Sequence, residues 1–311
     1  MNDPSIVLNT LTKAYGDRVV VDNVNFSVAA GTIFGYLGPN GSGKTTTIKM
    51  LCGLVRPTSG DAHVAGFDVE TQANQVRRAI GYMAQGFSLY GDLTVDENLE
   101  FYGRAYGMSA SAREARKRQV VETVGIGEYM QYLSANLSGG WQRRLALACA
   151  LLHDPTVVFL DEPTAGIDPV ARRDLWDLLF VLASAGKTFF VTTHYMDEAE
   201  RCSSLAYIYQ GHILASGSPD EICSMPDITP VDTVRYGIAT DDVMETFRQT
   251  HNLQYLRDAT IFGRDIHVVV DRRIAAAQLA RDVGVDASRV EPIRPSLEDA
   301  FVALTRKADA A

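Results

Sequence analysis

The sequence has few of the features that mark secreted or membrane-spanning proteins. Its 311 residues include only four cysteines, with no CxxC pair among them. Scattered in this way, they are typical of small buried side chains in a reducing compartment, not of disulfides or a zinc site. No apolar run approaches the roughly 18 residues of a spanning helix, and residues 1–4 lack a basic and then apolar signal. We therefore expect a cytosolic chain that does not cross a membrane by itself.

Basic side chains are also in deficit. Lys and Arg number 29 against 38 Asp and Glu, which gives a formal net charge of −9 and a pI of about 5.2. Affinity for a nucleic-acid backbone comes from clustered Lys and Arg, so this balance argues against nucleic acid as the main partner. The rest of the composition, 46% hydrophobic and 22% charged, is ordinary for a soluble protein with a sizeable core. The length suits about two domains.

The chain is organised around a glycine-rich loop, Gly38 to Thr45, with the sequence GPNGSGKT. It follows an apolar run at residues 33–37 that predicts a buried strand, and it precedes a helical pattern. Strand, loop and helix in this order form the phosphate-binding P-loop. Gly41 and Gly43 allow backbone conformations that let the loop amides converge on phosphate at the positive end of the helix. The sequence therefore predicts a nucleotide site.

Two side chains of this loop carry its chemistry. Lys44 is expected to reach the β- and γ-phosphates, and the Thr45 hydroxyl is expected to ligate magnesium. The alternative is a glycine turn with a chance lysine. With glycine near 7% of residues, the four fixed positions arise by accident in roughly one chain in a hundred of this length, so nucleotide binding is favoured.

Two further apolar strands are expected to end in reactive side chains. Residues 156–160 run into Asp161 and Glu162, and the strand at residues 188–192 ends close to His194. Ligands of an open parallel sheet bind at the carboxyl ends of its strands, so one nucleotide could contact all three clusters. Asp161 is expected to hold magnesium, and Glu162 to poise the attacking water as general base. By itself, His194 is more typical of a structural histidine.

A second helix start rich in serine and glycine lies at residues 137–140, with the sequence LSGG. Ser138 is a plausible N-cap, so this helix start also suits an anion. Residues 86–153 predict mostly helix, whereas short apolar bursts between positions 6 and 28 predict antiparallel strands ahead of the P-loop.

Together these motifs resemble those of the nucleotide-binding subunit of an ATP-binding cassette (ABC) transporter. The P-loop matches the Walker A motif, residues 157–161 match Walker B, and residues 137–140 match the start of the family signature. Gln85 falls at the Q-loop and residues 166–168 at the D-loop. The resemblance extends from residue 6 to about residue 220, with the motifs in family order.

The resemblance implies a set of site residues and two cofactors, ATP and magnesium. Catalytic roles are expected for Glu162, for His194 as the switch histidine, and for Gln85. Nucleotide contacts are expected from Tyr15, which would stack on adenine, and from Gly38, Asn40, Gly41, Ser42, Gly43, Lys44, Thr45, Thr46, Ser138, Gly139, Gly140 and Asp168. Magnesium is expected to be held by Thr45, Gln85 and Asp161.

Two positions depart from the family pattern. The signature usually reads LSGGQ, and here Trp141 replaces the glutamine, with Gln142 one place later. Because Ser138 and the following glycine amides make the expected phosphate contacts, we expect function to survive. The D-loop has Ile167 where leucine is commoner, which is a mild change.

The resemblance also implies partners. Walker A of one chain would face the signature of a second copy in a head-to-tail dimer, and a separate integral-membrane permease would dock around residues 85–108. The end of the chain, residues 294–301, resembles drug- and lipid-exporter subunits, so we expect export, with the protein on the cytoplasmic face of the cell membrane and no nucleic acid partner. The alternative is a non-transport ABC ATPase that acts as a switch in nucleic acid repair or translation. A third alternative, a P-loop kinase or GTPase, is least favoured because it would have no role for the signature residues.

We expect an α/β fold with two domains. Residues 1–224 would form an ABC-type P-loop core with an antiparallel β subdomain and a helical subdomain at about residues 86–155. Residues 225–311 would form a small α+β accessory domain, whose β-α-β-β-α-β pattern suits a ferredoxin-like fold. No catalytic constellation appears in it, which favours a packing or dimerisation module over ligand sensing. The transported substrate cannot be read from this chain.

Overall fold

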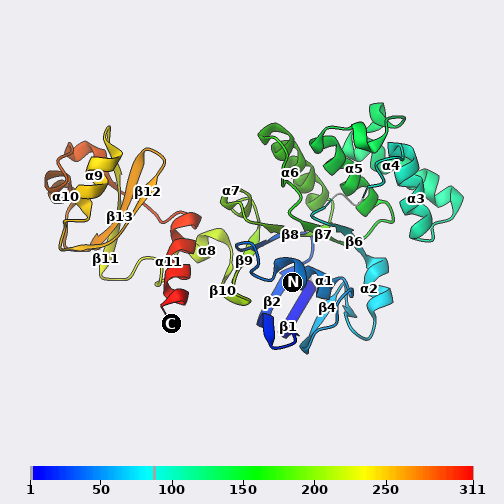
Figure 1. Cartoon of the computed structure of the whole chain (residues 1–311), viewed down its shortest axis with the longest axis horizontal. Helices are drawn as coiled ribbons and strands as arrows, with labels where there is room; N and C mark the ends of the chain where they lie inside the picture. Colours follow the sequence, from blue (N-terminus) through cyan, green and yellow to red (C-terminus); the bar gives the residue numbers. More distant parts are fainter. Residues whose placement is uncertain (1–2, 87–88, 311) are drawn as a thin grey trace. The chain divides into compact units, whose positions relative to one another are not determined.

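The computed structural model describes residues 3–86 and 89–310 (Figure 1). The chain divides into two compact units, the first ending at Ser218 and the second beginning at Pro219. The boundary expected from the sequence, residues 224/225, lies six residues further along the chain. The reason is the short helix α8 (Pro219–Cys223), which packs on the C-terminal helix α11 (Leu297–Asp309) and so belongs to the second unit.

The first unit begins with an antiparallel sheet. Its strand order is β2-β1-β4-β5, and each neighbouring pair is antiparallel. The strands are β1 (Pro4–Tyr15), β2 (Arg18–Ala29), β4 (Ser59–Val64) and β5 (Phe67–Asp68). Strands β1 and β2 carry buried residues at irregular alternation, which reflects the bulges in their register. Strands β1 and β2 are the antiparallel strands predicted ahead of the P-loop, while β4 and β5 follow it in the sequence.

A second sheet of six strands forms the centre of the first unit. Its order is β10-β9-β3-β8-β7-β6, parallel throughout except for the terminal β9–β10 hairpin. The strands are β3 (Ile33–Leu37), β6 (Ile80–Met83), β7 (Val157–Asp161), β8 (Thr188–Thr193), β9 (Ser204–Tyr209) and β10 (His212–Gly217). Strands β3, β7 and β8 are buried along their whole length, as continuous apolar runs inside a parallel sheet should be.

Helices complete the unit (Figure 1). Those connecting the sheets and strands are α1 (Lys44–Leu51), α2 (Ala73–Ala79), α6 (Pro169–Ser184) and α7 (Met196–Ala199). The helical region contains α3 (Val95–Ala105), α4 (Ala110–Val124) and α5 (Gly139–Leu151), with 3-10 turns at Gly127–Tyr129 and Ser134–Asn136. Helix α3 starts with a capping box, since Thr94 and Glu97 each accept from the other's backbone N–H.

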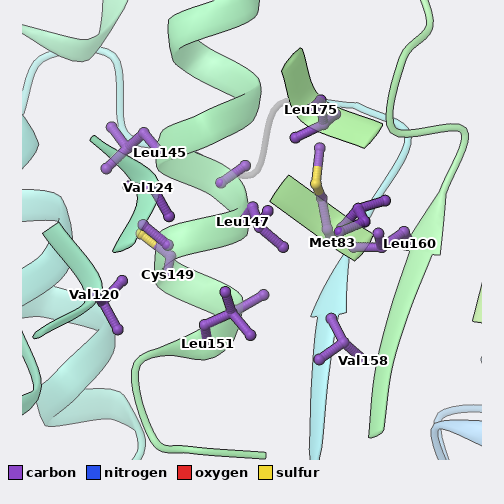
Figure 2. Close-up of a cluster of buried hydrophobic side chains, with 14 of the residues drawn as sticks. Met83, Val120, Val124, Leu145, Leu147, Cys149, Leu151, Val158, Leu160 and Leu175 are labelled. Atoms are coloured by element: carbon purple, nitrogen blue, oxygen red, sulfur yellow. The ribbon is translucent and has the colours of Figure 1, made fainter. Parts of the chain in front are cut away.

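Helix α5 connects the helical region to the central sheet through its apolar side chains (Figure 2). Leu145 and Cys149 lie towards Val124 of α4, while Leu147 lies towards Met83 of β6. Seven residues in succession, from Leu145 to Leu151, are buried. A helix segment that is apolar on all sides is buried in a core. This burial holds α5 in place and so fixes the position of its N-terminus, where the signature lies.

Helix α5 is followed by a half-buried histidine, His153. His153 stacks on Tyr106 with ring centroids 3.7 Å apart, and its Nε2 lies 2.9 Å from the carbonyl oxygen of Ile80. Burial lowers the pKa of His153, and the hydrogen bond to Ile80 opposes this only in part. The folded protein therefore keeps this imidazole neutral at pH values where the unfolded chain has already taken up a proton.

The free energy of unfolding should therefore fall as pH drops below about 6.5, the ordinary histidine pKa, towards the lowered folded value. In His153→Gln, which retains a donor for Ile80, the fall should be shallower over this window. Urea denaturation between about pH 7.5 and 5.5 measures it. The exposed His212→Gln serves as control and should follow the wild-type curve. Parallel curves for the wild type and His153→Gln would contradict the assignment.

The second unit is a four-stranded antiparallel sheet with helices. Its strand order is β12-β13-β11-β14, and its elements follow a β-α-β-β-α-β order before the C-terminal helix α11. They are β11 (Thr233–Ala239), α9 (Val243–Thr250), β12 (Leu256–Phe262), β13 (Asp265–Asp271), α10 (Ala276–Asp282), a 3-10 turn (Ala287–Arg289) and β14 (Val290–Pro292). Ile238, Ile266 and Val268 are fully buried in its own core.

Candidate nucleotide-binding site

Three neighbouring strands of the central sheet end in the clusters that the sequence singled out. In the order β3-β8-β7, they lead into the P-loop, His194 and the Asp161–Glu162 pair. All three run in the same direction, so their carboxyl ends meet at one edge of the sheet. The structure therefore brings together side chains that are more than 100 residues apart in the sequence, as expected for the carboxyl ends of parallel strands.

The P-loop joins β3 to α1 and depends on its glycines for two different reasons. Gly41 and Gly43 have φ angles of +81° and +111°, the left-handed region that favours glycine. Gly38 is needed for space, because a Cβ there would lie 2.2 Å from the carbonyl oxygen of Ile208 and 2.8 Å from Ser42 Oγ. The loop is thus packed directly against β9.

Substitutions in this loop should distinguish the need for a positive φ angle from the need for space. In Gly38→Ala the new methyl group must displace backbone, so we expect a loss of about 1–3 kcal/mol in the free energy of unfolding and weaker ATP binding. Gly41→Ala meets no atom within 4 Å and should cost about 1 kcal/mol, through its φ angle alone. Urea denaturation with fluorescent ATP-analogue titration measures both quantities. A larger stability loss in Gly41→Ala than in Gly38→Ala would contradict this reading of the loop.

The Lys44 side chain lies at the base of the loop. It is 5% exposed, and its Nζ donates to the carbonyl oxygens of Gly38 at 2.8 Å and Pro39 at 3.0 Å. Burial lowers the pKa of Lys44, while Glu162 and Asp161 oppose that shift. Ser42 Oγ, also buried, has no hydrogen-bond partner among the described residues. A phosphate oxygen is an acceptor that suits both groups, so the loop fits a polyphosphate.

Asp161 is fixed by two hydroxyl groups. Thr45 Oγ1 donates to its Oδ2 at 3.0 Å, and Thr192 Oγ1 donates to its Oδ1 at 2.6 Å. Asp161 is buried at the end of β7, and Thr45 lies in the first turn of α1. A hydroxyl and a carboxylate oxygen side by side are hard ligands of the kind magnesium prefers. The residues present therefore fit the ion that the sequence analysis expected.

Glu162 lies among three polar side chains. Its Oε2 accepts from Gln85 Nε2 at 3.0 Å and lies 3.4 Å from His194 Nδ1, and its Oε1 lies 3.7 Å from Lys44 Nζ. The backbone of Glu162 has φ +48°, and its N–H donates to the main chain and hydroxyl of Thr192. A non-glycine residue in this conformation stores strain, which is common where a side chain must be aimed at a ligand.

These groups border a cavity of about 400 Å³. Its lining residues are Tyr15, Arg18, Val20, Asn40, Gly41, Gly43, Lys44, Thr45, Thr46, Gln85 and Glu162. Nine of these were expected from the sequence. Tyr15 is 51% exposed, and Lys13 Nζ lies over its ring, 5.0 Å from the centroid.

Two lining residues, Arg18 and Val20, were missed by the sequence analysis. The signal was present, because Tyr15 and Arg18 are paired across a two-residue hairpin turn between β1 and β2. Once Tyr15 is placed at the site, its cross-strand partner must lie beside it. Arg18 therefore adds a cation to the lining on the strand that pairs with that of Tyr15.

Several expected residues lie outside the described cavity lining. Gly38, Ser42, Asp161 and His194 lie behind it, next to residues that do line it. The signature residues Ser138, Gly139 and Gly140 lie at the start of α5, and Asp168 caps α6 by accepting from the N–H groups of Val170 and Ala171. A single chain thus does not bring these last four residues to the cavity.

The unusual signature residues turn into the helical region. The Trp141 ring packs against Tyr129, with ring centroids 4.5 Å apart, and Arg144 lies 5.2 Å from its centroid. Gln142 donates from Nε2 to the carbonyl oxygen of Ser134 at 3.0 Å. Trp141 thus packs within its own subdomain, while Ser138 stays exposed at the helix start.

Two buried charged residues that the sequence analysis overlooked support the site from behind. Arg143 donates to the carbonyl oxygens of Gln85 at 3.0 Å and Ala165 at 3.1 Å, so it ties the Q-loop to the segment after Glu162. Glu198, 1% exposed, accepts from Thr164 and from Thr193 Oγ1. It therefore joins the segment after Glu162 to the residue preceding His194.

A buried parallel sheet with a P-loop, an acidic pair and a helical insertion defines a nucleotide-binding ATPase cassette. The profile of the family described as ABC transporter matches residues 21–165. The Nod factor export ATP-binding protein I of Cupriavidus metallidurans is 38% identical over 302 residues, which cover 96% of this chain and 96% of that protein. The chain therefore belongs to the family of ABC transporter ATP-binding proteins, whose members are ATPases.

A second curated relative and a solved structure are also similar to this chain. The probable multidrug ABC transporter ATP-binding protein YbhF of Escherichia coli is 47% identical over 212 residues, 68% of this chain, and the match spans only 37% of YbhF. Among solved structures, the dimeric bacterial ABC transporter cassette MJ0796 aligns with a TM-score of 0.62 at 28% identity, over 68% of this chain and 98% of that one.

In the described parts of this chain, no helix is both long and apolar enough to cross a bilayer.

Proposed function

We propose that this chain hydrolyses ATP with Glu162 as the general base. The observation that supports it is the position of the Glu162 carboxylate between Lys44, Gln85 and His194 at the end of β7. Glu162 accepts a proton from the attacking water, whose oxygen bonds to the γ-phosphorus while the bond to the β-γ bridging oxygen breaks and ADP leaves. His194 and Gln85 orient the carboxylate through their contacts with its Oε2.

The P-loop and the hairpin would bind the nucleotide. The amides of Asn40 to Thr46 surround the phosphates, and Lys44 exchanges its main-chain acceptors for phosphate oxygens. Tyr15 stacks on the adenine ring. Thr45 and Asp161, with Gln85, would hold magnesium, which when bound neutralises charge on the phosphates. Magnesium titration against ATP affinity tests this set, since Asp161→Asn should weaken the metal dependence.

The signature would act on the nucleotide of a second copy. Ser138, Gly139, Gly140 and Asp168 lie away from the cavity of their own chain, at the starts of α5 and α6. The start of α5, with the Ser138 hydroxyl and the glycine amides, is suited to a phosphate. The solved cassette MJ0796 is described as a dimer. A head-to-tail arrangement gives each of two sites one P-loop and one signature, so ATP closes the dimer and hydrolysis reopens it.

The work of this ATPase would be export through a separate integral-membrane permease. The names of the relatives refer to multidrug transport and Nod factor export, and we infer from them export, but no particular substrate. The permease would dock around residues 85–108, where the exposed rings of Tyr90 and Phe101 lie 4.5 Å apart, and hold the protein on the cytoplasmic face of the cell membrane. Gln85 would link the γ-phosphate to that surface.

Co-purification from membranes tests this proposal. The tagged chain should retain a multi-span membrane protein, and Phe101→Asp should release it without lowering the ATPase activity of the isolated chain. ATPase activity that is stimulated by nucleic acid, with no membrane partner retained, would favour the repair or translation class instead. The deficit of basic residues argues against that outcome.

A further inference from the structure

The second compact unit contains a cavity of about 760 Å³ that ATP hydrolysis does not use. Small-molecule sites are typically about 300–1,000 Å³, so the size suits a ligand. All lining residues lie between positions 220 and 295, which places the cavity within this unit. The chemistry of the lining shows which ligand class it fits.

Three arginines line the cavity, in a chain whose net charge is −9. Arg235 is 4% exposed, and its charge is balanced by Asp299, whose Oδ1 lies 2.8 Å from Arg235 Nη1. Arg272 and Arg294 are exposed. Among the described lining residues, Asp220 is the one carboxylate. The two remaining guanidinium groups thus outnumber the one carboxylate of the lining, and the cavity is cationic.

Two of these arginines are held by main-chain carbonyls. Arg272 Nη1 donates to Val231 O at 3.2 Å, and Arg235 Nη2 donates to Ile228 O at 3.3 Å. A guanidinium group fixed in this way loses less rotamer entropy when it binds a carboxylate or phosphate. The cationic side of the cavity is therefore organised before any ligand arrives.

Two buried polar atoms on lining residues have no hydrogen-bond partner in the described structure. They are Arg235 Nε and Thr229 Oγ1. Buried donors without an acceptor are rare in folded proteins, and an unoccupied acceptor position is a common explanation. Oxygen acceptors of an anion supply the missing partner with little rearrangement of the chain.

The rest of the lining is partly apolar. It includes Met225, Val234, Ile293 and Pro295. The backbone is fixed here as well, since Ile293 N donates to Arg235 O at 3.1 Å. An inorganic ion would leave this surface exposed to water, whereas an apolar group on the ligand would cover it and gain hydrophobic free energy.

We propose that the C-terminal unit binds a small organic anion, a carboxylate or a phosphate ester with an apolar body, in the cavity lined by Arg235, Arg272 and Arg294. The anionic group pairs with the arginines and the apolar body covers Met225 and Ile293. The sequence alone favoured a packing or dimerisation module for this unit, because an arginine cavity assembled from residues 220–295 leaves no linear motif.

Isothermal titration of the full-length chain tests the proposal with three probes: phenyl phosphate, octanoate and inorganic phosphate. At least one organic probe should bind saturably, about tenfold or more tighter than inorganic phosphate, and the better head group identifies the anion class. Arg272→Gln should weaken that binding about tenfold or more. Arg273→Gln is the matched control, because Arg273 is the next residue, exposed, equally charged and outside the lining.

Three results would overturn the proposal. The first is the absence of saturable binding by either organic probe. The second is equal weakening in Arg272→Gln and Arg273→Gln, which would reduce the effect to net charge. The third is binding that survives Arg272→Gln but is lost in Lys44→Ala, because the probe would then occupy the P-loop cavity. Probe binding is measured without ATP, so these results do not depend on whether the chain hydrolyses ATP.

Discussion

Replacing Glu162 by glutamine should abolish steady-state ATP hydrolysis while leaving ATP binding intact. The glutamine can still accept from Gln85 Nε2, as the carboxylate does now. It cannot take a proton from water, so the general-base contribution is lost, about 10²–10⁴-fold in rate. Since hydrolysis is what reopens the proposed dimer, the variant should accumulate as an ATP-bound dimer, visible in size-exclusion chromatography with multi-angle light scattering.

The matched control for this variant is Glu200→Gln, the same chemical change at an exposed glutamate outside the cavity. It should hydrolyse ATP at the wild-type rate and remain monomeric after turnover. Normal hydrolysis by Glu162→Gln would remove Glu162 from the role of base. Loss of ATP binding in the same variant would instead indicate that the carboxylate maintains the cavity, for example through Lys44.

Replacing Ser138 by alanine should lower ATPase activity about 10²–10³-fold, the usual effect of removing a donor that stabilises developing charge. The structure makes this variant informative. Ser138 occupies the N-cap position of α5 but its side chain makes no cap hydrogen bond. Its removal should therefore leave the free energy of unfolding almost unchanged, and single-chain ATP binding should also persist.

A contrasting cap variant separates activity from stability. Thr94 accepts from the Glu97 N–H in the capping box of α3, so Thr94→Ala should cost about 1 kcal/mol of stability. Urea denaturation and ATPase assays of both variants should give opposite patterns. A Ser138→Ala protein that is destabilised like Thr94→Ala, with full activity, would limit Ser138 to a structural role.

The strand ends were predictable because their signals are local. Each buried strand is a continuous apolar run, and the reactive side chains follow directly, as in Asp161 and Glu162 after β7. A parallel sheet then brings such ends to one edge by geometry alone. Strands β3, β8 and β7 are neighbours in this sheet, so the residues that follow them lie close together. Tyr15 and Gln85 have no distinctive local pattern and were predicted only from the family resemblance.

The supporting contacts were not predictable because they depend on pairing across the chain. Arg143 looks like a surface arginine in the sequence, yet it is buried between the carbonyls of Gln85 and Ala165. Glu198 looks like a solvated acid on a short helix, yet two threonine hydroxyls bind it. The six-residue difference between the expected boundary and the division of the structure has the same cause, since only the packing of α8 on α11 assigns α8 to the second unit.

The central claim, that each nucleotide site is completed by a second chain, is tested most directly by mixing two inactive variants. Lys44→Ala removes the P-loop cation and Ser138→Arg blocks the signature, so each protein alone should be inactive. In a head-to-tail mixed dimer, one site combines the intact P-loop of one chain with the intact signature of the other. Equimolar mixing should then restore ATPase activity to about a quarter of wild type, because half of the dimers are mixed and each has one intact site. A mixture as inactive as its components would contradict the account.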